Sequence, residues 1–451
     1  MPHPSTPLRF LDLFAGCGGL TAGLAAAGHT HVAGVEKSHM AAATYSANHT
    51  ATDPISDWRT AGDHAARPII EQLDTGICLA GVEEVVADPD AVAWLAAADI
   101  DAIVGGPPCQ GFSMNGTRTD GDPRDTLVWP MLQLVERLAP RFVVIENVEG
   151  MAAAKGDGKA VFDAAGEHLA ALGYAVQPCT VDAAHYAVPQ SRRRLLLIAD
   201  LGRPAGVREP FDSGDATGLL APPDLFPVPT TPHRPITVAE ALFDIDCDGY
   251  TTGPDDLGVY GSNVAGRWRA ARRAGRTDPL PNHELTRHSP TVVQRYRLLL
   301  AVHAAGLDPR LIPAAAKAND PSLLAPYDTL SVAGVCQPGE TVAEAAWRLR
   351  SRKRTQRVWD PDKPAPTLGT QSQDWIHPTA PRNPSPREMA RLQSFPDGYL
   401  LRGKVHTGGL KRRVETPTLT QVGNAVPPLL GEAIGKCLAA AVTAACLPLA
   451  A

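Results

Sequence analysis

Short apolar runs recur along the first part of the chain, and most are followed by a turn and then by a segment with helical spacing. The runs lie at 8–14, 31–36, 100–106, 141–148 and 192–200, and the helical segments at 19–28, 126–138 and 160–172. Apolar strands that alternate with helices are typical of a doubly wound α/β domain with a mainly parallel sheet. In such a sheet, ligands bind at the carboxyl ends of the strands.

The pattern changes after about residue 201. Segment 203–236 is rich in Pro and Asp and indicates an irregular connection, and from 237 to 385 the periodicity is poor. A helix is predicted again in PREMARLQSF, and the apolar stretch 423–442 predicts a buried C-terminal helix. We therefore expect a catalytic and cofactor-binding domain over 1–204, a smaller irregular domain over 205–419, and a C-terminal helix over 420–451 that packs back on the first domain.

Composition changes this picture only in part. The chain has 451 residues and a formal net charge of −6, which argues against a surface coated with DNA-binding cations. Phosphate binding needs only a local basic face, however. Two arginine clusters in the irregular domain are candidates, with a solvated helix face as the alternative for each. They comprise Arg267, Arg269, Arg272, Arg273 and Arg276, and then Arg348, Arg350, Arg352, Lys353, Arg354 and Arg357.

The eight cysteines are scattered and form no CxxC pair or zinc-like spacing, which favours reduced thiols and no metal. We find no signal-like N-terminus and no uninterrupted apolar run long enough to cross a membrane. A cytoplasmic protein is therefore expected.

A Gly-rich turn, DLFAGCGG (12–19), ends the first predicted strand and opens a helix. Such a turn lets the backbone approach a ligand beside a helix N-terminus, although alone it is equally typical of a tight βα connection. Glu36 ends the second strand, about 20 positions beyond the turn, where a carboxylate can accept hydrogen bonds from ribose hydroxyls.

Cys109 lies in GGPPCQGFS (105–113), directly after a predicted strand. A lone cysteine is usually buried packing. Here Pro107 and Pro108 cannot continue the strand ladder, so the chain leaves the sheet at the thiol and presents it to a cleft. The context favours a nucleophile.

Two further polar groups end strands. Glu146 and Asn147 follow an apolar run, and a carboxylate there is costly unless a site uses it or it caps a helix. Arg192 and Arg194, in QSRRR, alternate along a strand and so point to one face, where both could enter the same cleft.

Together these motifs resemble the cytosine-5 DNA methyltransferases, in the order that this family has them. DLFAGCGG resembles the family's cofactor loop, GGPPCQGFS its nucleophile loop, and Glu146-Asn147-Val148 and Gln190–Arg194 its two further active-site motifs. Additional similar segments are Asp122–Leu127, ARLQSFPD (390–397), QVGNAVPP (421–428) and PAPTL (364–368), which resembles the element that closes the family's target-recognition region.

The resemblance implies a Rossmann-like, S-adenosyl-methionine-dependent methyltransferase domain with a smaller target-recognition domain. It implies that the enzyme methylates carbon 5 of a cytosine flipped out of a specific sequence of double-stranded DNA. The implied catalytic residues are Cys109, Glu146, Asn147, Arg192 and Arg194. The implied cofactor-binding residues are Asp12, Phe14, Gly16, Gly18, Gly19, Glu36, Pro107, Leu127, Asn424 and Val426. No metal is expected.

In the implied mechanism the Cys109 thiolate adds to carbon 6 of the ring and makes carbon 5 nucleophilic. Glu146 stabilises or protonates N3, which requires a carboxyl that its environment keeps partly protonated. Arg194 orients the base at O2 and Asn147 supports the loop. The base must leave the duplex stack, and segment 110–122 has the composition of a lid.

The sequence departs from the family pattern at two positions. Gly81 stands where the family has an acidic residue that contacts the adenine amino group, so either Glu83 or the backbone replaces it. Asp125 stands where Gly or Asn is more usual.

Other interpretations remain open at this point. The chain could be an RNA cytosine-5 methyltransferase or a catalytically silent DNA-binding relative, although the long variable segment favours duplex DNA and the retained Cys109 and Glu146 favour catalysis. A Rossmann dehydrogenase is disfavoured because the turn lacks GxGxxG. We expect a monomer, with no membrane partner, that works alone or beside a separate restriction endonuclease.

Overall fold

The structure is a computed structural model of the 451-residue chain. It describes residues 7–108, 127–149, 155–156, 159–215, 223–242, 245–246, 249–250, 281–350, 356–369, 374–407 and 415–445. Several predicted residues lie outside this part of the chain: Cys109, the lid 110–122, Asp125, the whole first arginine cluster, and Arg352, Lys353 and Arg354 of the second.

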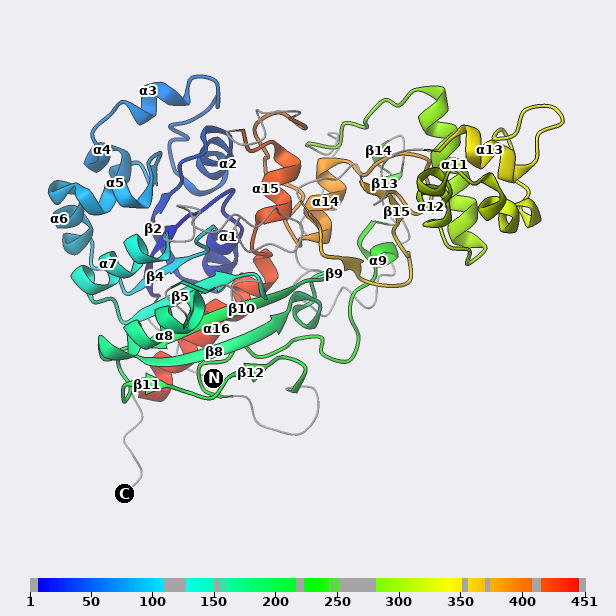
Figure 1. The fold of residues 1–451 in the computed structure, drawn as a ribbon. Coiled ribbons are helices and arrows are strands. Elements are labelled where there is room, and N and C mark those ends of the chain that lie inside the picture. Colours follow the sequence, from blue (N-terminus) through cyan, green and yellow to red (C-terminus); the bar gives the residue numbers. More distant parts are fainter. Residues whose placement is uncertain are drawn as a thin grey trace.

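A nine-stranded sheet forms the centre of the molecule (Figure 1). Its main path runs β11-β8-β10-β5-β4-β1-β2-β3, and β12 also pairs with β8. The strands are β1 Arg9–Leu13, β2 Thr30–Val35, β3 Ile77–Cys78, β4 Ala102–Gly105, β5 Phe142–Asn147, β8 Ala175–Asp182, β10 Arg193–Asp200, β11 Gly206–Val207 and β12 Phe211–Asp212. The expected α/β fold with a mainly parallel sheet is confirmed.

Strand order reverses between β1 and β4, because β2 and β3 continue on one side of β1 while β4 and β5 lie on the other. This reversal is the switch point at which doubly wound sheets bind their ligands. The DLFAGCGG turn leaves β1 there, and the GGPP segment leaves β4 beside it. The two predicted loops therefore begin on neighbouring strands.

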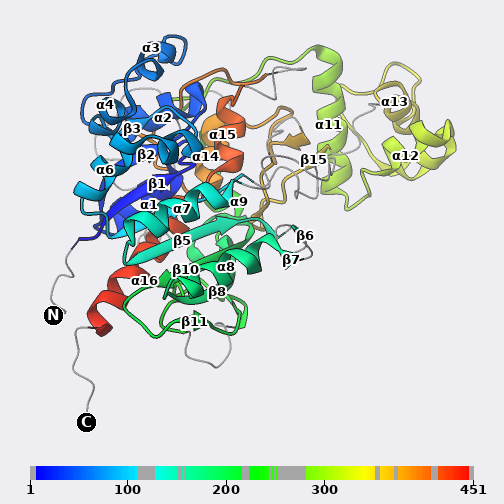
Figure 2. The same ribbon diagram turned by 60° about the vertical axis from the view of Figure 1, so that its left-hand side comes forward.

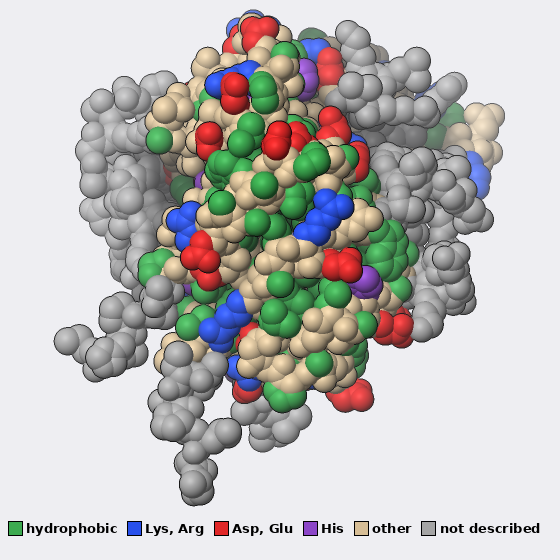
Figure 3. Space-filling model, turned by 90° about the vertical axis from the view of Figure 1, so that its left-hand side faces the viewer, with side chains coloured by type: hydrophobic (Ala, Val, Ile, Leu, Met, Phe, Trp, Pro, Cys, Tyr) green, Lys and Arg blue, Asp and Glu red, His purple; other side chains and the backbone are tan. Residues whose placement is uncertain are grey.

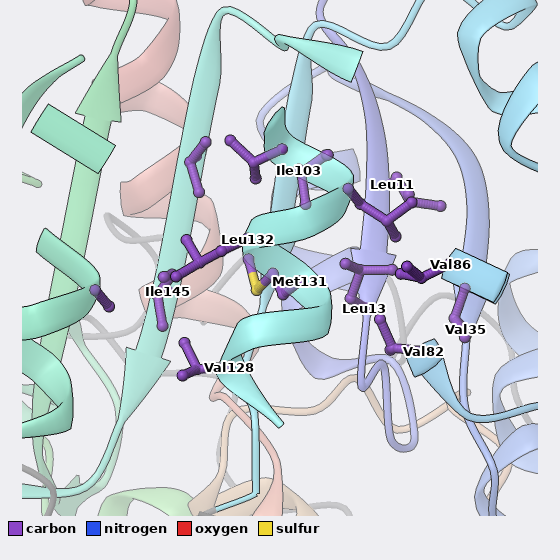
Figure 4. Close-up of a cluster of buried hydrophobic side chains, with 14 of the residues drawn as sticks. Leu11, Leu13, Val35, Val82, Val86, Ile103, Val128, Met131, Leu132 and Ile145 are labelled. Carbon is purple, nitrogen blue, oxygen red and sulfur yellow. The ribbon is translucent and has the colours of Figure 1, made fainter. Parts of the chain in front are cut away.

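Alternate strand residues face two separate apolar layers. Leu11, Leu13, Val35, Ile103 and Ile145 pack against one set of helices, as Figure 4 shows. That set comprises α5 Val82–Ala87, α6 Pro89–Ala97, α7 Val128–Leu138 and α8 Val161–Ala171. The intervening residues, such as Phe10 and Val104, face α1 Gly19–Ala26 and α16 Pro428–Ala445.

Helices α1 and α16 pack at very short range because glycines lie between them. A Cβ atom on Gly23 would collide with the carbonyl oxygen of Pro428, and a Cβ atom on Gly431 would lie 3.2 Å from the Cα of Gly23. The stretch Thr418–Thr443 is long and apolar enough to cross a membrane by length and composition, but 72% of its most apolar window is buried in the protein. Its apolar character is explained by this packing.

Residues 290–349 form helices that the sequence analysis did not assign. They are α11 Pro290–Ala304, α12 Leu311–Ala318, the 3-10 helix η5 Pro321–Thr329 and α13 Val342–Arg348, and they stand away from the sheet (Figure 2). Their buried side chains, including Tyr296, Leu299 and Tyr327, make a separate apolar cluster. Helices α12, η5 and α13 have only 8, 9 and 7 residues, so each has too few apolar positions to show a clear period.

Arg348, from the second arginine cluster, is occupied by a structural partner. The Arg348 guanidinium donates to both carboxylate oxygens of Glu340, at 2.7 and 2.8 Å, and to the carbonyl of Val335. The prediction of a phosphate contact is therefore wrong for Arg348. Arg350 stacks on Trp347 at 4.0 Å and is exposed, as is Arg357, and for both the phosphate contact stays a prediction.

The face in Figure 3, which carries α3 Ala61–Ala65, α4 Ile69–Asp74 and the helices after them, shows basic and acidic side chains interspersed. Among the described residues of this face, no continuous basic surface is present. A DNA backbone would find no preferred track on it.

Candidate active site

The direction of β10 brings the two predicted active-site motifs together. Strand β10 runs antiparallel to β5, so its first residues lie at the carboxyl end of β5, with Leu196 opposite Glu146 and Leu195 opposite Asn147. Arg194 precedes this pair and reaches the same edge of the sheet. A parallel strand would have placed the arginines at the opposite edge.

Glu146 and Arg194 form a buried ion pair. The Arg194 Nε atom lies 2.9 Å from Glu146 Oε1, and the side chains are only 8% and 9% exposed. The contact is not aligned as a hydrogen bond, and the buried Oε1 makes no hydrogen bond to any described residue. The carboxylate is thus fixed in place by charge while retaining the capacity to bond to another group.

Asn147 connects the end of β5 to the segment that precedes Cys109. Its Nδ2 donates to the carbonyl of Pro107 at 2.9 Å, and its Oδ1 accepts from the Val148 N–H. Gly106 lies over Glu146, since a Cβ built there would be 3.1 Å from Oε2. Pro107 and Gly106 therefore hold fixed positions beside the carboxylate, immediately before the predicted nucleophile.

Arg192 is buried like Arg194, whereas Arg193 between them is exposed and pairs with Glu149 and Asp212. The Arg192 Nη1 donates to the carbonyl of Leu368 at 3.3 Å. The alternation expected along this strand is therefore observed, and it directs Arg192 to the PAPTL element.

A chain of buried amides continues from that element. The Leu368 N–H donates to Gln190 Oε1, Gln190 Nε2 donates to Gln393 Oε1, and Gln393 Nε2 donates to the carbonyl of Val422, at 2.8, 2.8 and 2.7 Å. All four residues are fully buried. The PAPTL element, the arginine strand and the two late motifs are thus held in one register.

The DLFAGCGG turn has an unusual backbone. Phe14, Gly16 and Gly18 have φ angles of 56°, 56° and 85°, so three of five consecutive residues occupy the left-handed region. Glycine adopts this region without strain, whereas Phe14 does so at a cost. The turn ends at the first residue of α1, where the N–H groups of the first turn have no partner within the helix and are suited to a polar ligand.

Asp12 is buried beneath this turn and accepts a hydrogen bond from the Thr21 hydroxyl at 2.6 Å. Burial away from water raises the pKa of Asp12 to about 7, partly offset by the Thr21 hydrogen bond. Through this hydrogen bond Asp12 links β1 to α1, and it therefore supports the turn between them.

Glu36 bridges the turn and the second strand. One carboxylate oxygen accepts from the Gly16 N–H at 2.9 Å and the other from the Ser38 N–H at 2.7 Å. Burial raises the pKa of Glu36, and these two backbone hydrogen bonds act against that rise. Each oxygen keeps a lone pair, so the carboxylate can also accept from a hydroxyl group of a ligand.

The departure at Gly81 has a structural counterpart. The carboxyl group of Glu83 lies over Gly81, with Cδ and Oε1 both 2.6 Å from the position that a Cβ of residue 81 would take. The neighbouring Glu84 caps α5, and its carboxylate accepts from the Gly81 N–H at 2.9 Å. An acidic group therefore occupies the space beside β3 although residue 81 has no side chain.

The C-terminal motif reaches the turn from the other side. A Cβ atom on Gly19 would collide with the carbonyl of Val426, so the two backbones are in direct contact. Asn424 ends α15 Thr418–Asn424 and is exposed. Leu127 precedes α7 and is half-buried. The predicted cofactor roles of these residues remain predictions.

Four aromatic side chains beneath the turn were not predicted to belong to the site. His31, Tyr45, His49 and Tyr399 contact one another in tilted pairs, with ring centroids 4.8 to 6.4 Å apart. Tyr45 bonds to Thr21 at 2.9 Å and to His31 Nε2 at 2.6 Å. No spacing in the sequence signals this group, because His31 lies on β2, Tyr45 and His49 lie on α2 His39–His49, and Tyr399 comes from a distant segment.

These buried histidines predict an acid-sensitive fold. Burial lowers the pKa of His31 to about 4, below its value of about 6.5 in an unfolded chain. The neutral ring therefore stabilises the fold fully above pH 6.5, and this stability is lost as the pH falls toward 4. We expect His31→Gln, which keeps an N–H donor but cannot titrate, to reduce the pH dependence of the unfolding free energy by about 1.4 kcal/mol per pH unit between pH 6 and 4.5.

The measurement is urea unfolding of both proteins at several pH values. Equal slopes for the two proteins would contradict the assignment of His31 as a buried neutral group.

Among the described residues, no three His, Cys, Asp or Glu side chains converge in a way that could hold a metal ion. The groups gathered at the switch point are a carboxylate paired with an arginine, a proline-bound amide and a glycine turn. Their chemistry suits proton handling and organic ligands.

Comparison with known proteins agrees with this geometry. The family described as "C-5 cytosine-specific DNA methylase" matches residues 8–204 and 325–440, which is more than half of the chain. The Type II methyltransferase M.DdeI of Desulfomicrobium norvegicum is 29% identical over 95% of this chain and 88% of its own length. The Type II methyltransferase M.AgeI of Thalassovita gelatinovora is 28% identical over 97% and 100%.

Among solved structures, a putative DNA modification methyltransferase encoded within an Escherichia coli prophage covers 96% of this chain and 98% of its own, with a TM-score of 0.58 and 22% identity. This likeness supports the α/β fold. The family match covers residues 8–204, with the predicted active-site motifs, and residues 325–440, with the late motifs. The chain therefore belongs to the C-5 cytosine-specific DNA methylase family.

Proposed function

We propose that the protein transfers a methyl group from S-adenosyl-methionine to carbon 5 of a cytosine that is flipped out of a specific sequence in duplex DNA. The observation that carries the proposal is the buried Glu146–Arg194 pair at the carboxyl end of β5, beside Gly106 and Pro107. A carboxylate with a free bonding position, next to a fixed guanidinium, matches the N3 and O2 atoms of cytosine.

On the nucleophile side, Cys109 adds to carbon 6 of the ring, and Glu146 stabilises the charge or the proton that then develops at N3. Arg194 holds Glu146 and orients the base at O2. Asn147 fixes the Pro107 carbonyl and thereby the start of the nucleophile loop. Arg192, bonded to Leu368, aligns the arginine strand with the end of the target-recognition region.

On the cofactor side, S-adenosyl-methionine supplies an electrophilic methyl group. The residues present fit such a molecule. Glu36 can accept from ribose hydroxyls, the first turn of α1 offers N–H groups to a carboxylate, and the space beside Gly16 is open to within 3.9 Å. Glu83 takes the part of the acidic residue that position 81 lacks.

The cytosine lies inside a stacked duplex, so it has to be extruded before these groups can act on it. We assign target recognition to residues 205–419, with Arg350 and Arg357 as phosphate contacts. The protein acts in the cytoplasm, as a monomer, alone or beside a separate restriction endonuclease.

The test is a methyl-transfer assay with labelled S-adenosyl-methionine, mixed-sequence duplex DNA and an RNA transcript of the same sequence, followed by bisulfite sequencing. Label in DNA at cytosines within one short context is expected. Label in RNA alone would favour an RNA methyltransferase, and label in neither would favour a catalytically silent relative.

The position of Glu83 gives a prediction for the methyl donor. We expect Glu83→Gln to weaken binding of S-adenosyl-homocysteine about five- to tenfold, because a charge-assisted hydrogen bond to the adenine amino group is lost. Isothermal titration calorimetry measures the effect.

Glu84→Gln is the matched control, since that carboxylate is already engaged by the Gly81 N–H and caps α5. The double variant Gly81→Asp with Glu83→Gln is expected to recover the affinity. Equal binding by Glu83→Gln and the unmodified protein would rule out this contact.

A further inference from the structure

Two side chains from outside the DLFAGCGG turn, Tyr399 and His49, contact the backbone of that turn. The Tyr399 hydroxyl donates to the carbonyl of Cys17, and it also bonds to His49 Nε2 at 2.7 Å. Tyr399 is 6% exposed and follows the ARLQSFPD motif. It therefore reaches the DLFAGCGG turn from a segment 382 positions away.

The direction of these hydrogen bonds is determined by the available protons. A carbonyl can only accept, so the single Tyr399 hydroxyl proton points to Cys17. The hydroxyl oxygen must then accept from His49, whose Nε2 carries the proton. Burial lowers the pKa of His49 to about 3, so the ring is neutral and keeps this one tautomer.

The same pair closes the space below Gly18. A Cβ atom at this position would lie 2.8 Å from the Tyr399 hydroxyl, and the His49 ring is closer still. Gly18 has a φ of 85°, and its N–H donates to the carbonyl of Ala15 at 2.9 Å. Tyr399 and His49 thus contact the part of the turn where the left-handed backbone passes into α1.

Neighbouring contacts keep Tyr399 itself in place. Arg387 donates to the Tyr399 carbonyl, and the Phe395 ring packs against Tyr399 at 4.8 Å. Asn48, adjacent to His49, exchanges hydrogen bonds with both the N–H and the carbonyl of Leu400, at 3.0 and 2.8 Å. The backbone around Tyr399 and the helix that carries His49 are therefore held together by these contacts.

We infer that Tyr399 and His49 are positioning residues for methyl-donor binding, which fix the Cys17 carbonyl and with it the left-handed turn from Phe14 to Gly18. This inference deepens the proposed function and rests on it. Each side chain acts on the donor through the backbone of the turn and not by direct contact. Loss of the hydroxyl lets the Cys17–Gly18 peptide rotate and weakens the ligand, while the groups that act on cytosine stay in place.

The test compares Tyr399→Phe with Tyr174→Phe. Tyr174 is equally buried and its hydroxyl donates to the carbonyl of Pro140 at 2.6 Å, at the opposite edge of the sheet from the turn. Each variant loses one buried hydroxyl–carbonyl hydrogen bond, and Tyr399→Phe also loses the bond from His49, so a somewhat larger loss of thermal stability is expected from Tyr399→Phe. Only Tyr399→Phe is expected to raise the Kd for S-adenosyl-homocysteine and the KM for the methyl donor, about three- to tenfold.

Two further readouts separate positioning from general damage. At saturating donor, kcat and the KM for DNA of Tyr399→Phe are expected to stay within about twofold of the unmodified protein. His49→Gln, which keeps an N–H donor, is expected to bind the donor nearly normally, whereas His49→Leu is expected to bind it two- to fivefold more weakly, roughly the effect of one lost neutral hydrogen bond.

Equal donor affinities for Tyr399→Phe and Tyr174→Phe, in an unmodified protein that binds the donor and methylates DNA, would overturn the inference and leave the proposed function intact. Failure of the unmodified protein to bind S-adenosyl-homocysteine would overturn both.

Discussion

Alanine at position 109 is expected to reduce methyl transfer by a factor on the order of 10⁴ or more, the scale seen when an enzyme loses its nucleophile. Without the thiolate, carbon 6 is not attacked, the ring keeps its aromaticity, and carbon 5 never becomes nucleophilic. Binding of duplex DNA and of S-adenosyl-homocysteine should persist, because neither requires the sulfur atom. Radiolabel incorporation and a gel-shift assay measure the two properties.

DNA that carries 5-fluorocytosine traps the covalent adduct between the enzyme and the base. In DNA that carries 5-fluorocytosine, carbon 5 has no proton to lose, so an enzyme bound through Cys109 cannot be expelled after methyl transfer. The unmodified protein should form an adduct that survives denaturation, and Cys109→Ala should form none. Cys336→Ala is the matched control, since this half-buried thiol lies in the separate helical cluster. An adduct with Cys109→Ala would show that another group is the nucleophile.

Glu146→Gln is expected to lower kcat about 10²- to 10³-fold, because an amide of the same shape cannot share a proton with N3. The KM for DNA should change less, since the residue acts mainly after the base has entered the site. The variant should also be less stable, because Arg194 loses the carboxylate that neutralises it in a buried position. Steady-state kinetics and thermal unfolding measure both effects.

The stability effect can be separated from the catalytic one. Arg391 and Asp397 form a second buried ion pair, with an Nε–Oδ1 distance of 2.8 Å and both side chains 6% exposed. We expect Asp397→Asn to cost similar stability but far less activity. If the two variants lose activity in equal measure, Glu146 has a structural rather than a catalytic role.

The sequence predicts those helices and strands whose apolar residues recur with a regular spacing. The strands and helices of the catalytic core follow from apolar runs and turns, and the placement of Glu36 and Glu146 at strand ends follows from the carboxyl-edge rule. The short strand β3 and the edge strands β11 and β12 were not predicted, because two-residue strands carry no period. Strand β8 was also missed, since Gln177, Pro178 and Thr180 interrupt its apolar pattern.

The site itself is predicted only as a set of residues, not as an arrangement. Alternation correctly indicated that Arg192 and Arg194 share a face. Nothing local indicates that β10 runs antiparallel, and this direction is what brings Arg194 to Glu146. The bidentate contact that occupies Arg348 and the carboxyl group of Glu83 over Gly81 depend on side-chain conformations, which periodicity does not encode.

The long-range support of the cofactor turn has a consequence for biosynthesis. His29 and Cys17 are held by Gly435 and Tyr399, which are made 406 and 382 residues later. At about 5–20 residues per second, the ribosome needs roughly 20–80 s to bridge that interval. During this time α1 exposes the face that α16 will cover, so the nascent chain offers an apolar surface to chaperones. The turn and α1 therefore receive these contacts only after residue 435 has been made, and not when the first 204 residues alone have left the ribosome.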